Sequence, residues 1–117
     1  MKAKIERGGL FDVSQSNLAD LYWGPMQMLA HHASSGCGLR TGDLMGTGTL
    51  SSPPGKYGNT LGCLHELTEA GKVPLKLGDG KSTLFLEDND EVVFEAWVGK
   101  GSSIGFGEVR GKLLPCI

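Results

Sequence analysis

Several features that would mark particular protein classes are missing from this sequence. No apolar stretch approaches the roughly 20 residues that a membrane-spanning helix needs, so we expect no membrane partner. The formal net charge is -2, and no run of Lys or Arg forms a basic stripe, which argues against nucleic-acid binding. The first residues carry charges without the apolar core of a secretory signal.

Cysteine is also scarce. The chain has three cysteines, Cys37, Cys63 and Cys116, and no Cys-x-x-Cys pair. An odd and sparse set is not a disulfide framework, and a structural zinc site is not indicated. We therefore expect reduced thiols and a cytoplasmic location.

Glycine, in contrast, is abundant, with 19 of the 117 residues, more than twice the roughly 7% that is usual. The glycines are scattered between Val, Ile, Leu and Phe, which predicts a β-rich fold with many tight turns. The group from Gly99 to Gly111, which includes Gly101, does not have the spacing of a dinucleotide-binding loop. We interpret these residues as turn glycines.

One helix is predicted, near the N-terminus. Residues 1–15 are expected to be irregular. Ser16 or Asn17 can cap a helix whose apolar residues follow helical spacing as far as Ser35, with Gly36 as the C-cap. Pro25 lies inside this span and predicts a kink or a break after a first turn.

Short strands are predicted after the helix. The ranges are 44–50, 61–68, 72–77, 83–86, 91–98 and 104–109, with turns at 78–80 and 88–90. Asn89 can adopt a positive φ in the second turn. The strongest pattern, 91–98, alternates Val92, Phe94 and Ala96 with Val93, Glu95 and Trp97. The fold class is therefore a β-rich α+β fold, with one N-terminal helix followed by a mixed set of short strands.

The polar residues alone suggest no catalytic group. His31 and His32 lie about 100° apart on a helix, so they cannot face one metal ion together. We expect one to be packed and the other to lie on the surface. His65 and Glu66 fall in a predicted strand, where neighbours point to opposite faces. A direct acid–base pair is therefore not expected, and a solvated Glu66 is the simpler interpretation. Ser14, Ser16, Ser102 and Ser103 lack the strand-to-helix context of a nucleophile elbow, so we assign them no chemistry.

A longer pattern points to a known family. Residues 16–49 read SNLADLYWGPMQMLAHHASSGCGLRTGDLMGTGT. This segment resembles the fumarylacetoacetase (fumarylacetoacetate hydrolase) family, in which a Tyr-Trp helix leads through His-His, Gly-Cys, Leu-Arg and Gly-Asp-Leu to a Gly-Thr. The wider superfamily shares the Gly-Asp and Gly-Thr part, whereas the Tyr-Trp and His-His part is specific to the family.

The second half of the chain continues the resemblance. Leu64–Leu67 is similar to the family's Leu-Glu-Leu segment, preceded by a small insertion. Residues 86–92 resemble an acidic turn in which Asn89 replaces the usual Gly. Residues 104–107 and 111–115 are similar to the family's C-terminal signature. The resemblance runs from about residue 14 to the end, so residues 16–117 are identified as the C-terminal part of a catalytic domain.

The resemblance implies a fold, a reaction and site residues. The family has a β-roll-like fold, forms a homodimer and holds Mg²⁺ or Ca²⁺. It hydrolyses 4-fumarylacetoacetate to fumarate and acetoacetate in tyrosine and phenylalanine catabolism. A histidine activates water and a glutamate orients that histidine, while cationic groups stabilise the leaving carbanion. Thr49 resembles the substrate-binding threonine, and Glu66 resembles the catalytic-site glutamate.

Other family residues have no counterpart here. The catalytic histidine, the metal carboxylates, the arginine and the lysine all precede the Tyr-Trp helix in the family. We therefore expect this chain to be inactive alone, as a fragment, one half of a split gene or a degenerate relative. Two alternatives stay open: a non-catalytic stand-alone domain, and part of a related hydrolase or decarboxylase acting on another 2,4-diketo acid.

Overall fold

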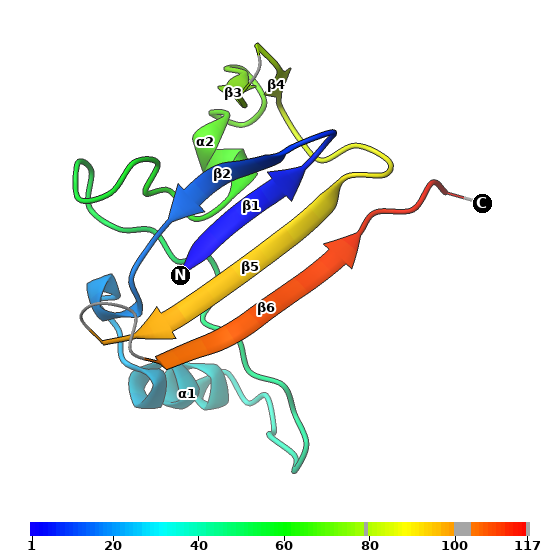
Figure 1. Cartoon of the computed structure of the whole chain (residues 1–117). Coiled ribbons are helices and arrows are strands. Elements are labelled where there is room, and N and C mark those ends of the chain that lie inside the picture. The colour runs from blue at the N-terminus through cyan, green and yellow to red at the C-terminus, as the bar shows by residue number, and fades with distance from the viewer. Residues whose placement is uncertain (79, 100–103, 117) are drawn as a thin grey trace.

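The computed structural model describes residues 1–78, 80–99 and 104–116. Asp79 of the predicted turn and Gly101 of the glycine group lie outside these ranges. A four-stranded antiparallel sheet forms the centre of the molecule (Figure 1), in the order β2 (Leu10–Gln15), β1 (Lys2–Glu6), β5 (Glu91–Val98), β6 (Ile104–Lys112). A small ribbon of β3 (Leu75–Lys76) and β4 (Ser82–Thr83) and helix α2 (Leu64–Leu67) lie near one end of this sheet, and α1 (Pro25–Ser34) lies near the other. The β-rich α+β class predicted from the sequence is confirmed.

The first fifteen residues are not irregular, which corrects the prediction. They form β1, Lys2–Glu6, and β2, Leu10–Gln15, paired as an antiparallel hairpin. Gly8 at the turn has φ 65°. The Gly-Gly pair between two extended runs was the hairpin signal. The high proportion of charged residues obscured it, because β1 places Lys2, Lys4 and Glu6 on one face.

The predicted helix is broken into two pieces. A 3-10 turn, η1, covers Leu18–Asp20, and Asn17 caps it by accepting a hydrogen bond from the backbone N–H of Ala19 at 3.0 Å. Helix α1 is Pro25–Ser34. Pro25 therefore opens the second piece, at the position where its missing N–H is not needed. This confirms a break at Pro25, and Gly36 follows the helix with φ 80°.

The middle of the chain departs most from the predicted strands. Residues 44–50 form no strand, and the predicted strand 61–68 is replaced by a short helix, α2, Leu64–Leu67. The next two strands are reduced to β3, Leu75–Lys76, and β4, Ser82–Thr83, which pair with each other.

The C-terminal strands agree with the sequence. Strand β5 is Glu91–Val98, as predicted, and β6 extends over Ile104–Lys112. The turn before β5 holds Asn89 at φ 73°. In the pairing register Phe94 faces Ala3 and Val109, whereas Val93 faces Lys4 and Arg110. The expected alternation of faces is therefore present, up to a bulge between Glu95 and Trp97.

The two faces of the sheet differ in chemistry. One carries ion pairs, Lys4–Glu95 at 2.6 Å and Arg110–Glu6 at 2.8 Å. The other is apolar, and part of it is covered: Ile5 and Val13 pack with Leu77 in a small core to which α2 contributes. The remainder, along β5 and β6, stays open, and the exposed apolar side chains there include Phe94, Ile104, Phe106 and Val109.

The molecule is extended for its length. Its radius of gyration is 16.3 Å, whereas a compact domain of this length has about 13 Å. Among the residues that the structure describes, no helix has the length and apolar character needed to cross a membrane.

Candidate active site

The candidate site is built on two chain segments that lie against the edge of β2. Gln15 donates its backbone N–H to the carbonyl of Asn59 at 2.8 Å, and the Ser14 hydroxyl donates to the carbonyl of Leu61 at 2.6 Å. The 59–61 segment in turn accepts from the next one, because Ser52 N–H donates to the Thr60 carbonyl at 2.9 Å. Segments 50–52 and 59–62 are thus fixed to the sheet.

Gly62 allows these two segments to approach closely. A Cβ atom built at Gly62 would overlap the carbonyl oxygen of Leu50 and would lie 2.8 Å from Cγ2 of Thr49. No other residue type fits without moving the chain. The Gly62 N–H also donates to Oε2 of Glu66 at 3.2 Å. Gly62 therefore lies between Thr49 and Glu66, the two positions that the family resemblance selected.

Helix α2 sets the direction of the Glu66 side chain. Leu64 and Leu67, one turn apart, pack against the core, so His65 and Glu66 are left on the exposed side. The two side chains do not point to opposite faces of a strand, as the sequence suggested, because no strand forms here. Glu66 instead folds back onto Gly62, just before the helix, in the manner of a helix-capping glutamate.

The Glu66 carboxylate has further neighbours. Its Oε2 atom also accepts from the Ser51 hydroxyl at 2.9 Å and from the Cys63 thiol at 3.4 Å. Ser51, Gly62 and Cys63 were not selected from the sequence. The only available hint was the position of Ser51, two residues after the Gly-Thr motif. The other two residues matter through contacts that folding creates.

Thr49 lies beside an open hollow of about 880 Å³. Its walls come from segment 46–50, from η1 and from the apolar residues of β5 and β6. Thr49 itself is exposed. The hollow is therefore continuous with the open apolar face of the sheet, which supplies Phe94, Ala96 and Phe106 to its lining.

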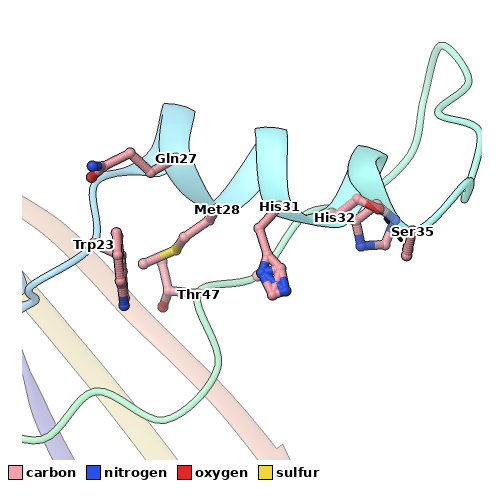
Figure 2. Close-up of a pocket in the computed structure, with 8 residues that line it drawn as sticks. Trp23, Gln27, Met28, His31, His32, Ser35 and Thr47 are labelled. Atoms are coloured by element: carbon pink, nitrogen blue, oxygen red, sulfur yellow. Dashed lines mark hydrogen bonds between the residues drawn. The ribbon is translucent and has the colours of Figure 1, made fainter.

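A second hollow of about 530 Å³ lies beneath α1. Figure 2 shows the side chains of Met28 and His31 pointing from α1 into this hollow, with Trp23 on the segment before the helix, Thr47 next to Met28, and His32 beside Ser35. Both histidines are exposed, so the expected packed histidine is not found. The two hollows share Gly46 and Thr47 in their linings.

The described residues do not fit a divalent cation. No group of three or more His, Cys, Asp or Glu side chains within residues 1–78, 80–99 and 104–116 is placed to hold a metal ion. Two carboxylates of the acidic turn at 87–91 already have a cationic partner. Arg7 donates to Asp90 through Nε at 2.6 Å and to Glu87 through Nη1 at 2.8 Å. The arginine also holds the pKa of the Asp90 carboxyl below its usual value.

Comparison with known proteins identifies relatives. The model of the fumarylacetoacetate (FAA) hydrolase C-terminal family matches residues 9–114. The fumarylacetoacetase of Arabidopsis thaliana is 49% identical over 105 residues, which cover 88% of this chain and 24% of the relative. The human enzyme is 42% identical over 107 residues, 90% of this chain and 25% of the relative. The fumarylacetoacetase of Caenorhabditis elegans is 46% identical over 105 residues, which cover 88% of this chain and 24% of the relative. The chain thus spans about a quarter of the length of these relatives.

Proposed function

The chain belongs to the fumarylacetoacetate hydrolase family, and we propose that it forms the C-terminal segment of an enzyme that hydrolyses 4-fumarylacetoacetate to fumarate and acetoacetate. The observation that carries this proposal is the meeting of Thr49 and Glu66 at Gly62. These positions lie 17 residues apart in the sequence, and a shared structural contact between them is what a common site requires.

The two side chains have different roles in this proposal. Thr49 binds substrate, since it is exposed beside the larger hollow. Glu66 accepts the N–H of a histidine supplied by the upstream part of the enzyme. A carboxylate in that place fixes the tautomer of the imidazole and stabilises the imidazolium that forms when the histidine takes a proton from water. The activated water then attacks the substrate carbonyl, and the carbon–carbon bond breaks. The carbonyl fragment leaves as fumarate, and the electron pair of the broken bond goes to the other fragment, which takes up a proton to give acetoacetate.

The remainder of the site comes from outside this segment. Within the described residues no histidine side chain forms a hydrogen bond with Glu66. The accessible surface is 8430 Å², about 2,300 Å² more than expected for a compact monomer of this mass. An excess of that size is comparable to the surface buried in obligate interfaces. It supports a partner that covers the apolar face and the hollow beside Thr49.

We extend the proposal to the cation, the assembly and the location. The Mg²⁺ or Ca²⁺ that the family resemblance implies would be held by upstream carboxylates, because the acidic groups described here are unsuited to it. The complete enzyme would be a cytoplasmic homodimer. The thiols of Cys37 and Cys63, which form no disulfide, are compatible with a reducing compartment.

The test uses a chimera in which this chain replaces the matching quarter of the Arabidopsis fumarylacetoacetase. We expect the chimera to cleave fumarylacetoacetate and Glu66→Gln to lower kcat about 100-fold or more, since glutamine keeps the shape but not the charge. Circular dichroism should show an unchanged fold.

Glu69→Gln is the matched control. Glu69 lies on the same short segment and is exposed, and no described contact places it near Thr49. Its substitution should leave kcat within a factor of two or so, an effect below 0.5 kcal/mol on the scale of tenfold per 1.36 kcal/mol. Full activity of the Glu66→Gln chimera would show that Glu66 has no part in the reaction. If the chimera cleaved a different 2,4-diketo acid faster than fumarylacetoacetate, that acid would replace fumarylacetoacetate as the proposed substrate.

A further inference from the structure

The Glu66 carboxylate is held on one side only. Its Oε2 atom accepts three hydrogen bonds, from the Ser51 hydroxyl, the Gly62 N–H and the Cys63 thiol. Within the described residues none of the hydrogen bonds found involves its Oε1 atom. The carboxylate is therefore anchored through one oxygen while the other remains available to a donor outside this chain.

Ser51 makes the shortest of the three contacts, 2.9 Å, and it is engaged twice. Its hydroxyl has one hydrogen, which it donates to Glu66, and its oxygen accepts the Gly62 N–H at 2.9 Å. The same N–H is shared with Glu66. Ser51, Gly62 and Glu66 thus form a closed triangle of hydrogen bonds.

The triangle joins the two halves of the candidate site. Ser51 follows Thr49 by two residues in the 49–52 segment, and Glu66 belongs to α2. Ser51 itself is half-buried and its neighbours Leu50 and Ser52 are buried, so the segment around it is well fixed. A long glutamate side chain on an exposed helix face would otherwise sample several rotamers.

We propose that Ser51 is a positioning residue that fixes the Glu66 carboxylate so that Oε1 is presented to the water-activating histidine. This inference rests on the proposed function. It differs from a role in capping α2, because a cap stabilises the helix whatever the reaction does, whereas a positioning residue acts on kcat through Glu66.

A double-mutant cycle in the chimera separates the two roles. We expect Ser51→Ala to lower kcat about tenfold, the effect of losing one hydrogen bond to a charged group, with little change in KM. In the Glu66→Gln background the same change should cost almost nothing, since the charge that it positions is already gone. Ser51→Thr keeps a hydroxyl and should restore most of kcat, with Ser51→Cys, a weaker donor, lying between Thr and Ala.

Ser52→Ala is the matched control. The adjacent Ser52 hydroxyl accepts the backbone N–H of Asn17 at 2.9 Å and does not contact Glu66. Any loss of kcat that Ser52→Ala causes is structural. In the double variant with Glu66→Gln, the fold-losses of kcat from the two substitutions should therefore multiply.

Four outcomes would overturn the inference. Full kcat for Ser51→Ala, or multiplicative losses for Ser51→Ala and Glu66→Gln, would show that Ser51 does not act through Glu66, while the proposed function stands. Full kcat for Glu66→Gln would remove both the proposed role of Glu66 and the inference about Ser51, while an active chimera would still support the proposed hydrolase function. If Ser51→Ala fails to fold, the order Ser, Thr, Cys in kcat carries the test, and equal values for all three would refute the inference.

Discussion

At the scale of single residues, the most constrained contact is the ion pair between Arg7 and Asp90. Asp90 is 2% exposed and receives two hydrogen bonds from the guanidinium of Arg7, which also reaches Thr83 at 3.2 Å. The Asp90 carboxylate also accepts the backbone N–H of Glu87 at 2.8 Å. This contact joins the end of the β1–β2 hairpin to the start of β5.

We predict that Asp90→Asn destabilises the chain by about 3 kcal/mol, because it leaves the charge of the half-buried Arg7 without its main partner. Urea denaturation at neutral pH measures the loss. Asp12→Asn is the control, since Asp12 pairs with Lys2 on the surface with 61% of its side chain exposed, and such pairs contribute little. Equal losses of stability for Asp90→Asn and Asp12→Asn would show that the buried pair contributes no more than the surface pair.

The pH dependence of this pair has a definite sign. Arg7 lowers the pKa of Asp90 in the folded state, so the folded state binds fewer protons than the unfolded state around that pH. The contribution of the pair is complete above the unfolded pKa of about 4 and is lost as pH falls through the lower folded pKa. The stability difference between the wild-type chain and Asp90→Asn should therefore be largest near neutral pH and shrink below about pH 4.

At the scale of elements, the sequence predicted correctly those features that depend only on neighbouring residues. Strand β5, the break at Pro25 and the positive φ of Asn89 follow from alternation, from a missing N–H and from backbone sterics. Residues 44–50 read as a strand, but a strand needs a partner, and none of the described strands pairs with them. Leu64–Leu67 is too short for its helical period to be distinguished from a strand.

The candidate site could be predicted only in part. Thr49 and Glu66 were selected by resemblance to a family, and the residues alone favoured a solvated Glu66. Ser51 and Gly62 could not be found in this way, because their roles depend on two loops meeting. Such approaches are set by the tertiary fold and leave no periodic pattern in the sequence.

The close approach at Gly62 gives a prediction for the loop that carries the site. Gly62→Ala should destabilise the chain by about 1–3 kcal/mol, the usual cost of inserting a methyl group into a packed contact. In the chimera it should also lower kcat, because segment 49–51 must move away from α2. Denaturation curves and steady-state kinetics measure the two effects.

Gly58→Ala provides the control within the same loop. A Cβ at Gly58 would have no atom within 4 Å, so the substitution should leave stability and kcat nearly unchanged. A Gly62→Ala variant as stable and active as Gly58→Ala would contradict the packing at this junction.

At the scale of the whole molecule, the sheet resembles one layer of a larger structure. Its charged face is satisfied by ion pairs, whereas much of its apolar face is open, with Phe106 and Val109 each 70% exposed. Domains bury such faces between two packed layers. The relatives are about four times as long as the matched segment, so their additional chain is the natural source of a second layer.

The most direct test of the proposed function is to add this chain to a polypeptide that contains the remaining three quarters of the Arabidopsis fumarylacetoacetase and to measure fumarylacetoacetate hydrolysis. We predict no turnover by either polypeptide alone, and turnover on mixing that reaches its maximum at one chain per partner. Turnover by this chain alone, or a stable complex that remains inactive, would contradict the proposal that it supplies the missing quarter of a hydrolase.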